Sequence, residues 1–465
     1  MTDPAIFKAY DIRGIYPDQI NEDNIKDIVK AIYTFFVQVL EKKNLTIVLG
    51  RDMRISSPSL SKKAQEALIE LGAQVVDIGL STTPSVYYAV FKYHYDGGIQ
   101  ISASHNPKQY NGLKFLYQKN GQLIKVAKNT GMDKVKEIAI NKTFTKSEKT
   151  GTITEKEILN EEIQSAYDTV GIKTLRPLKV VADPANAMGI MFLEKIFNKI
   201  PGSQLIKLNF ELDGTFPAHE ANPLKFHTLK ELQKKVSETK ADLGIATDGD
   251  ADRIYFINEK GEIVLATLIT ALIAREILNK KRGEKILVDI RYTKNAQKVI
   301  EDNGGMMEVN IVGHSLITEH LNRVGGAFAG ESSGHYFFRE TGGAESSIRV
   351  IYHVLDVLTR DPRPFSEILA ELHSSNESSE INYKLPSDLK SKEVLEKIAQ
   401  QYPDSKVSWL DGLTIDFPDW RFNIRSSNTE PLIRLNLEAN NLELMKEKLN
   451  EVTDKILSFG ATAED

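Results

Sequence analysis

Three aspartates at alternate positions form the most chemically distinctive segment of the chain. Asp248, Asp250 and Asp252 belong to the loop TDGDADR, which follows a short apolar segment. In an extended backbone, side chains at positions i, i+2 and i+4 project to one side. Three carboxylates gathered in this way repel one another unless a cation joins them. An all-oxygen ligand set suits Mg²⁺, so the loop predicts a magnesium site.

The aspartate loop has two other interpretations besides a metal site. The plainest is a solvated acidic turn. An EF-hand calcium loop would have Glu259 at its twelfth position, but it requires glycine at the sixth, where this chain has Arg253. The residues before the loop also have the character of a strand rather than of a helix. The metal site and the solvated turn therefore stay open on the residues alone.

A serine-containing loop, residues 102–107 with the sequence SASHNP, follows another short apolar segment. The hydroxyl of Ser104 is a candidate nucleophile or phosphate carrier, and the alternative is a turn serine bonded to its own backbone. The loop lacks the Gly-x-Ser-x-Gly pattern of esterases, so an esterase triad is not supported. Asn111 and Gly112 predict a tight turn into the next strand.

A third polar loop, residues 330–335 with the sequence GESSGH, also follows an apolar segment. Its glycines, its carboxylate and its hydroxyls suit hydrogen bonding to sugar hydroxyls, although glycine-serine loops are common. His335 in this loop and His314 are two of nine histidines, and either one alone is more often structural than catalytic.

Arg425 precedes a run of serines, asparagine and threonine in the last quarter of the chain. A guanidinium beside hydroxyls and an amide is a plausible phosphate clamp, because its fork-shaped donors match phosphate oxygens. An arginine at the end of a strand, followed by a polar turn, is the alternative interpretation.

The three polar loops occupy equivalent positions in a repeated pattern, because each follows the last strand of a strand–helix–strand–helix–strand segment. Such alternation predicts parallel βαβ units. Ligands bind beyond the carboxyl ends of the strands in these sheets, so the loops would form three walls of one cleft. The predicted strands are 46–50, 74–78 and 98–101, then 179–182, 205–208 and 242–246, then 285–288, 307–311 and 326–329.

The fold class predicted from this repeat is α/β, with four domains. Three similar βαβ-type mixed-sheet domains precede a smaller α+β C-terminal domain, in which 391–402 and 442–457 have helical periodicity and 413–417, 421–425 and 432–437 alternate as strands. A polar linker is expected at 141–156, and a break at the prolines of 361–364. The expected domains are 1–150, 151–255, 256–365 and 366–465.

Bulk composition narrows the class of protein. The chain has 465 residues, a net charge of −5 and no cysteine. Disulfides, thiolate nucleophiles and cysteine-ligated zinc are therefore excluded. We expect no nucleic-acid partner and no membrane span, and the N-terminus has no signal-peptide pattern. A cytoplasmic protein is the expectation, and either a monomer or a dimer is compatible with it.

Taken together, the polar segments resemble those of the α-D-phosphohexomutases. The resemblance covers essentially the whole chain, with the segments in the family's order, and it implies four domains around a central cleft. The matching segments are residues 7–14 (FKAYDIRG), 102–107 (SASHNP), 248–253 (DGDADR), 330–335 (GESSGH) and 425–431 (RSSNTEP).

The resemblance also implies a role for each loop. The first domain would carry the phosphoserine loop, the second the metal-binding loop, the third the sugar-binding loop, and the fourth would bind the distal phosphate. Implied catalytic residues are Ser104, Arg253, Lys114, Arg13 and His105. Implied Mg²⁺ ligands are Asp248, Asp250 and Asp252 with the oxygen of phosphorylated Ser104. Implied substrate-binding residues are Tyr10, His314, Glu331, Ser333, His335, Arg425, Ser427, Asn428 and Thr429.

In the implied reaction, the phosphate of Ser104 passes to a sugar monophosphate. The resulting hexose 1,6-bisphosphate, which also serves as activator, reorients and returns its other phosphate to Ser104. The opening segment resembles phosphomannomutase and dual phosphomannomutase/phosphoglucomutase members, so mannose and glucose phosphates are the expected substrates. The alternatives are a phosphoglucosamine mutase, a Mg²⁺-dependent sugar phosphatase and a catalytically silent sugar-phosphate sensor.

Four positions depart from the commoner pattern of the family. Ser102 stands in place of a frequent threonine, and Ser332 in place of methionine, glutamate or glutamine. Arg291 replaces a frequent lysine, which keeps the charge and changes the donor geometry. Thr318 also replaces a frequent lysine, so one contact to an anion is in doubt.

Overall fold

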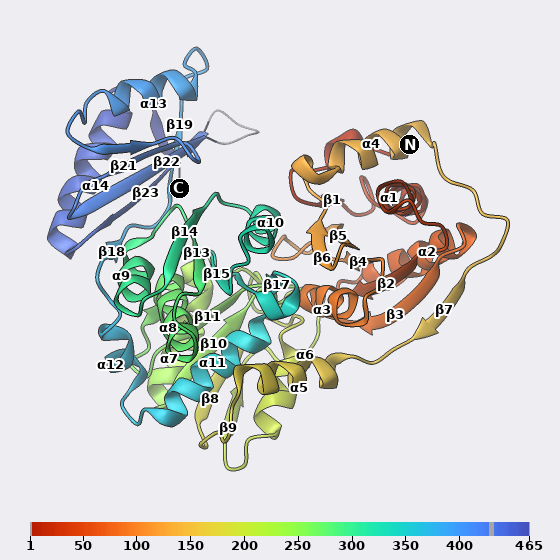
Figure 1. Ribbon diagram of the computed structural model, residues 1–465, viewed down its shortest axis with the longest axis horizontal. Coiled ribbons are helices and arrows are strands. Elements are labelled where there is room, and N and C mark those ends of the chain that lie inside the picture. The colour runs from red at the N-terminus through yellow and green to blue at the C-terminus, as the bar shows by residue number, and fades with distance from the viewer. Residues whose placement is uncertain (1, 427–431, 465) are drawn as a thin grey trace. The chain divides into compact units, whose positions relative to one another are not determined.

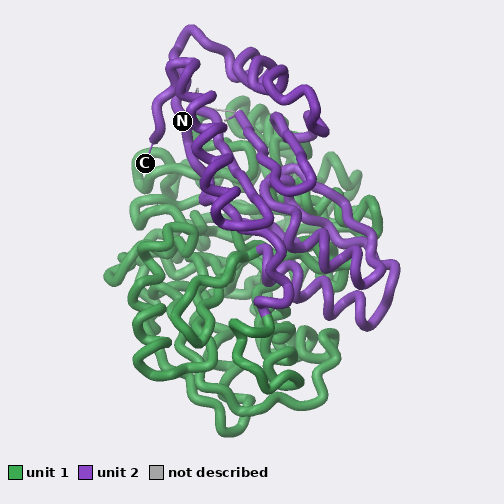
Figure 2. Tube along the Cα trace, turned by 90° about the vertical axis from the view of Figure 1, so that its left-hand side faces the viewer, with its two compact units in different colours: residues 1–266, 313–329, 333–368 green, residues 267–312, 330–332, 369–465 purple. Residues whose placement is uncertain are grey.

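The computed structural model describes residues 2–426 and 432–464 of the chain. The fold divides into two compact units, which Figure 2 shows in different colours. Unit 1 comprises residues 1–266, 313–329 and 333–368, and unit 2 comprises 267–312, 330–332 and 369–465. Within the described residues, no helix is both long and apolar enough to cross a membrane.

The first sheet of unit 1 has the order β1-β5-β4-β2-β3-β7, with β6 paired to β5. Its central strands β2, β3 and β4 are parallel, and β5 is antiparallel to β4 and to β1, so the sheet is mixed. The strands are β1 (Ile12–Ile15), β2 (Thr46–Arg51), β3 (Gln74–Leu80), β4 (Gly97–Ile101), β5 (Tyr110–Lys119), β6 (Gln122–Lys125) and β7 (Thr152–Glu155). The helices are α1 (Asn24–Leu40), α2 (Ser57–Glu70), α3 (Thr83–Tyr93) and α4 (Met132–Asn141).

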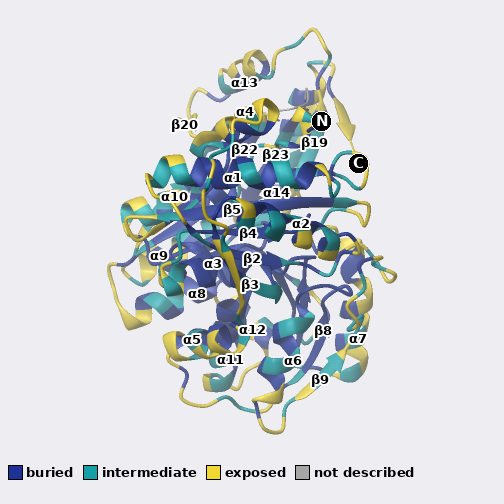
Figure 3. Ribbon diagram, turned by 90° about the vertical axis from the view of Figure 1, so that its right-hand side faces the viewer, coloured by how far each residue is buried: buried dark blue, intermediate teal, exposed yellow. Residues whose placement is uncertain are grey.

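Helical periodicity explains how α1 packs on this sheet. Ile25, Ile28, Ile32 and Phe36 recur at helical spacing, so they form one apolar face, and all four are buried in the core cluster of the first sheet. In Figure 3 the inner strands β2 and β4 are buried, whereas the edge strand β7 is exposed. The buried central strands hold the loops that follow them in fixed places.

The second sheet of unit 1 repeats the parallel core, with the order β12-β11-β10-β8-β9. Strand β8 is parallel to β9 and to β10, and β11 then returns antiparallel to β10. The strands are β8 (Lys179–Asp183), β9 (Gln204–Lys207), β10 (Leu243–Thr247), β11 (Ile254–Ile257) and β12 (Ile263–Val264), and the helices are α5 (Leu159–Val170), α6 (Ile190–Asn198) and α7 (Lys230–Thr239).

The third repeat contributes elements to both units. In unit 2, β13 (Lys285–Asp289) and β14 (Met306–Asn310) pair in parallel around α9 (Lys294–Asp302). In unit 1, β16 (Tyr336–Phe338) and β17 (Ala344–Glu345) pair antiparallel. The remaining elements of this repeat are α8 (Ala266–Lys280), α10 (His314–Val324), β15 (Phe328–Gly330) and α11 (Ser347–Arg360).

The C-terminal part of unit 2 forms an antiparallel sheet with the order β20-β21-β22-β23-β19-β24, and β18 pairs with β23. Glu438 of β23 accepts hydrogen bonds from the backbone N–H groups of Thr293 (2.7 Å) and Lys294 (3.1 Å), which begin α9. The strands are β18 (Asn376–Glu377), β19 (Ile381–Lys384), β20 (Lys406–Ser408), β21 (Leu413–Asp416), β22 (Trp420–Ser426), β23 (Leu432–Ala439) and β24 (Thr462–Glu464). The helices are α12 (Phe365–Ala370), α13 (Ser391–Ala399) and α14 (Leu442–Leu457) (Figure 1).

The predicted α/β class with mixed sheets and an α+β C-terminal part is confirmed, and the predicted strands agree with the observed ones to within two residues or so at each end. The prediction of a turn at Asn111 and Gly112 is wrong, because both residues lie inside β5. A Cβ at Gly112 would lie 2.1 Å from the carbonyl oxygen of Ile12, so this glycine permits close pairing with β1. The side chain of Asn111 is buried and donates to Ser56 and Ser57.

Candidate functional site

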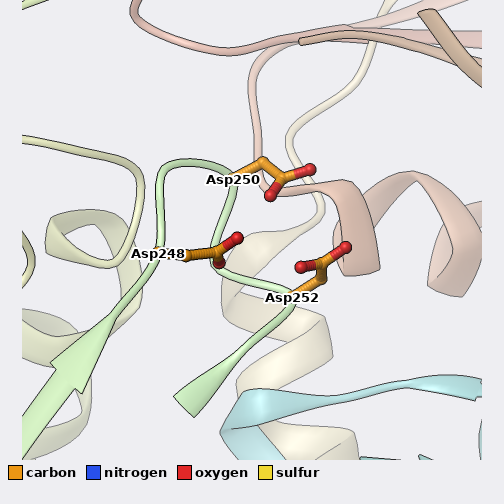
Figure 4. Close-up of side chains that lie close together, drawn as sticks. All are labelled: Asp248, Asp250 and Asp252. Atoms are coloured by element: carbon orange, nitrogen blue, oxygen red, sulfur yellow. The ribbon is translucent and has the colours of Figure 1, made fainter. Parts of the chain in front are cut away.

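The three aspartates of the loop between β10 and β11 converge in unit 1, as Figure 4 shows. Asp248, Asp250 and Asp252 are all buried, and one carboxylate oxygen of each lies within 4.8 Å of the others. The loop is a turn rather than the extended segment that the sequence suggested, because Ala251 has a φ of 58°. The predicted gathering of carboxylates is therefore present, and the solvated acidic turn is excluded by the burial.

A buried lysine lies among these carboxylates. The Nζ atom of Lys114, on β5, lies 2.7 Å from an oxygen of Asp250 and 2.6 Å from an oxygen of Asp252. Burial and the repulsion of Asp252 raise the pKa of Asp248 well above its ordinary value. Burial would also raise the pKa of Asp252, but the attraction of Lys114 outweighs it and holds that pKa well below the ordinary value. One lysine does not balance three carboxylates.

The aspartate cluster fits a divalent cation on two observations. Three buried carboxylates lie together, and Lys114 pairs with two of them, Asp250 and Asp252. Oδ1 of Asp250 is buried, and no hydrogen-bond donor for it occurs in the part of the chain that the structure describes. A hard cation prefers such carboxylate oxygens, so Asp248, Asp250 and Asp252 are suited to hold one.

Ser104 lies directly beside the aspartate cluster. It follows β4, has a φ of 50° and is only 2 % exposed. Its hydroxyl donates to Oδ2 of Asp248 at 2.9 Å, and Nδ1 of His105 lies 3.2 Å from the same hydroxyl oxygen. The predicted loops after β4 and β10 therefore meet, and they bring a nucleophilic oxygen to the carboxylates.

Two arginines add positive charge near Ser104, and a neutral histidine lies beside its hydroxyl. Arg13 on β1 forms an ion pair with Asp11 at 2.6 Å and donates to the side chain of Asn106 in the serine loop. Nε of Arg253 lies 3.2 Å from Nε2 of His335. Burial, and then the positive charges of Arg253 and Arg13, hold the pKa of His105 well below its ordinary value, so its ring is neutral near pH 7.

Four further residues predicted to bind substrate lie in unit 1. The rings of Tyr10 and His314 have centroids 5.7 Å apart, and those of His314 and His335 are stacked at 6.3 Å. Ser333 lies with its hydroxyl oxygen 2.9 Å from Nδ1 of His335. Burial, and then the charge of Lys125, lower the pKa of His314 well below its ordinary value. The structure thus joins this set to the aspartates through His335, whose Nε2 lies 3.3 Å from Asp252.

The other predicted binding residues belong to unit 2. Glu331 forms an ion pair with Arg291 at 3.1 Å, and Arg291 also pairs with Asp289 at 3.0 Å. Arg425, at the end of β22, lies 2.8 Å from a carboxylate oxygen of Glu380. The predicted residues Ser427, Asn428 and Thr429 lie outside the described residues.

Several residues in contact with the site carried no local signal in the sequence. Thr83 at the start of α3 donates its hydroxyl to Asp250. Lys125 and Glu345 form a buried ion pair, and Glu345 lies 3.7 Å from Nδ1 of His314. These partners are separated by 167 and 220 positions, respectively, so only the folded chain reveals them. Thr318, where a contact to an anion was in doubt, instead donates to the backbone carbonyl of His314.

Comparison with known proteins agrees with this geometry. Four family models match in order: phosphoglucomutase/phosphomannomutase α/β/α domain I at residues 4–143, domain II at 160–261, domain III at 262–375 and the C-terminal domain at 380–455. A phosphomannomutase of Vibrio cholerae is 32% identical over 98% of this chain and 99% of its own length. A phosphoglucomutase of Neisseria gonorrhoeae is 33% identical over 93% of each chain.

A solved structure supports the same assignment. A phosphoglucomutase/phosphomannomutase family protein of Burkholderia thailandensis superposes with a TM-score of 0.89 at 27% identity, and all of both chains is covered. Together with the four matched domains and relatives aligned over nearly the whole length, this result places the chain in the phosphoglucomutase/phosphomannomutase family of α-D-phosphohexomutases.

Proposed function

We propose that this enzyme interconverts the 1-phosphates and 6-phosphates of mannose and glucose through a phosphorylated Ser104. The observation that carries the proposal is the hydroxyl of Ser104, which donates to Asp248 beside two further buried carboxylates and Lys114. The names of the relatives support both sugars, since one is a phosphomannomutase and another a phosphoglucomutase.

Mg²⁺ is the cofactor that the carboxylate cluster suits. Asp248, Asp250 and Asp252 would hold it, with the phosphorylated oxygen of Ser104 as a further ligand. When bound, the cation neutralises charge on the phosphoryl oxygens as they transfer. The same charge would favour the ionised form of Asp248, whose pKa is raised by burial and by the repulsion of Asp252.

The transfer itself breaks the bond between phosphorus and the Ser104 oxygen and forms a bond between phosphorus and a sugar hydroxyl oxygen. Arg13, Arg253 and the N–H donors near Ser104 stabilise the charge that is spread over the phosphoryl oxygens. Burial lowers the pKa of Lys114, but the attraction of Asp250 and Asp252 is stronger and raises it overall, so Lys114 acts as a fixed cation. His314 is neutral and is the base available for the proton of the sugar hydroxyl.

The product of this first transfer is a hexose 1,6-bisphosphate. It turns around, its other phosphate returns to Ser104, and the isomeric monophosphate leaves. Supplied from outside, the same bisphosphate activates unphosphorylated enzyme. We propose that sugar hydroxyls are bound by Glu331 and Ser333, with Tyr10, His314 and His335 beside them, and that Arg425 binds the distal phosphate together with Ser427, Asn428 and Thr429.

The burial of Ser104 favours a mutase over a phosphatase. Ser104 is only 2 % exposed, so bulk water has little access to a phosphate on its hydroxyl oxygen. A bound sugar brings its own hydroxyl to the phosphoryl group, and an oriented acceptor reacts far faster than a free one. Transfer to sugar is therefore favoured over hydrolysis.

The test is an assay of the purified enzyme with mannose 1-phosphate and glucose 1-phosphate, Mg²⁺ and a trace of the matching hexose 1,6-bisphosphate. Formation of both 6-phosphates without release of inorganic phosphate is the expected result. Turnover of glucosamine 1-phosphate alone would reassign the substrate, and release of inorganic phosphate in proportion to substrate would reassign the reaction as hydrolysis.

A further inference from the structure

Arg54 is a fully buried arginine with no direct part in the proposed phosphoryl transfer. It lies between β2 and α2, and its side chain is 1% exposed. A buried guanidinium needs an acceptor for each of its N–H groups, because an unpaired one costs free energy. What Arg54 contacts therefore shows what the fold uses it for.

The acceptors are backbone carbonyls of the serine loop. One terminal nitrogen of Arg54 donates to the carbonyl of Ser104 at 2.8 Å and of Asn106 at 2.6 Å. The other donates to the carbonyl of Pro107 at 2.9 Å and of Tyr110 at 3.0 Å. One planar group thus binds four carbonyls within seven residues of chain, that of Ser104 and three on its C-terminal side.

The guanidinium is itself held from behind. Asp52 lies 3.2 Å from Nε of Arg54, and its other oxygen accepts from the backbone N–H of Arg54 at 3.0 Å and from the hydroxyl of Ser57 at 2.5 Å. The ring of Phe216 lies 5.1 Å from the guanidinium carbon. Asp52 therefore balances the charge of the guanidinium by an ion pair, although Nε of Arg54 has no hydrogen-bond partner among the described residues.

The serine loop needs such a support because its backbone is not relaxed. Ser104 has a φ of 50°, in the left-handed region that residues with a side chain disfavour. Its carbonyl also faces the aspartate loop so closely that a Cβ at Gly249 would lie 2.2 Å from it. Held there by Arg54, this carbonyl turns the hydroxyl of the same residue toward Asp248.

We propose that Arg54 is a positioning residue for phosphoryl transfer: by binding the carbonyls of Ser104 and of the residues that follow it, Arg54 fixes the serine oxygen against the aspartate cluster. The inference rests on the proposed function of Ser104. Arg54 reaches the reaction only through the backbone of the loop.

Arg54→Lys tests the geometry separately from the charge. Lysine keeps the cation but loses the planar fork and has three donors instead of five. We expect a fall in kcat of about 100-fold with KM changed by less than about threefold, because small misplacements of a reacting group cost this much. The rate at which glucose 1,6-bisphosphate phosphorylates Ser104 in a single turnover, followed by intact mass, should fall by a similar factor.

Arg421→Lys is the matched control. Arg421 is also a buried arginine, paired with Glu438 at 3.0 Å, and it is remote in sequence from the serine loop. Both variants should lose thermal stability, but only Arg54→Lys should slow phosphorylation of Ser104. If Arg54→Lys does not fold, Asp52→Asn replaces it, since it keeps the arginine and removes the carboxylate that orients it.

The outcomes separate this inference from the proposed function. Wild-type enzyme that is never phosphorylated on Ser104 would contradict the proposed function itself. Wild-type enzyme that is phosphorylated and active, with a folded Arg54→Lys or Asp52→Asn variant that is phosphorylated at the same rate, would overturn the role of Arg54 alone.

Discussion

The charged groups of the two units are balanced in different ways. In unit 1, Lys114 pairs with two of the three buried carboxylates, Asp250 and Asp252, and one oxygen of Asp250 has no donor among the described residues. In unit 2, Arg425 is already paired with Glu380, and Arg291 with Asp289 and Glu331. The first site has more carboxylates than its lysine pairs with, whereas the arginines of the second site are already paired.

This difference indicates how each site takes its ligand. A cation can enter the aspartate cluster without displacing any carboxylate. A phosphate that binds Arg425 must instead replace Glu380, whose side chain is 30% exposed and can turn to water. The reacting end of the substrate would therefore meet a fixed site, and the distal phosphate an exchangeable one.

The largest effect should come from the serine at the fixed site. Ser104→Ala removes the phosphate carrier, so mutase turnover should fall by at least about 10³-fold, as for other covalent nucleophiles. Steady-state assays measure the loss, and circular dichroism checks the fold. Ser61→Ala, at a buried serine of α2, is the control and should keep its activity. Near-normal turnover of Ser104→Ala would defeat the phosphoserine mechanism.

Weakening the cation site is expected to have the second largest effect. Asp250→Asn removes one of three ligating charges, so the Mg²⁺ concentration for half-maximal activity should rise by about 10- to 100-fold. Asp289→Asn is the matched control in unit 2, because it is a buried aspartate paired with an arginine. Its Mg²⁺ midpoint should not move. If Asp250→Asn and wild type reach half-maximal activity at the same Mg²⁺ concentration, the proposal that this loop binds the metal would be wrong.

Releasing the arginine of the exchangeable site should have a smaller effect. Glu380→Gln leaves Arg425 without its carboxylate competitor, so KM for the sugar phosphate should fall, by about threefold because the pair is partly exposed and screened. The value of kcat should stay unchanged. Glu396→Gln, which removes a charge from exposed α13, serves for comparison. A higher KM in Glu380→Gln would mean that Glu380 orients Arg425 instead of competing for it.

The smallest effect on activity is expected from two buried glutamates, one in each unit. Burial raises the pKa of Glu162 from 4.5 to about 7 and that of Glu377 from 4.5 to about 8. The folded chain therefore keeps protons that the unfolded chain releases, and stability falls as pH rises from 4.5 to those values.

Glutamine at either position imitates the protonated acid at every pH. Glu162→Gln should remove the decline of stability up to pH 7 in unit 1, and Glu377→Gln the decline up to pH 8 in unit 2. Melting curves between pH 5 and pH 9 measure this, and activity should change little. Parallel curves for the variants and wild type would show that neither glutamate takes up a proton on folding.

Sequence patterns predicted those parts of the molecule that depend on neighbours in the chain. The apolar segments became β2, β4, β8, β10 and β13 because their residues are buried on both faces, and the polar loops follow the carboxyl ends of β4 and β10. The burial of Asp248 and the left-handed turn at Ala251 were not predictable, since spacing alone suggested an extended segment.

Contacts between distant residues account for what the sequence could not show. Arg54 reaches carbonyls 50 to 56 positions away, and Glu380 meets Arg425 across 45 positions. Backbone carbonyls carry no side-chain signature, so nothing in the sequence marks them as partners of an arginine. The local turn signal of Asn111 and Gly112 misled for a related reason, because pairing with β1 outweighed it.

The hydrogen bonds of Glu438 to the first N–H groups of α9 limit how the protein can be engineered. The last hundred residues match a family model of their own at 380–455, so replacing this segment with that of a relative is an obvious experiment. Yet Thr293 and Lys294 depend on a carboxylate from that segment to cap their helix. A chimaera would need an acidic residue at the position of Glu438, and a truncation before it would fray a helix almost 150 positions upstream.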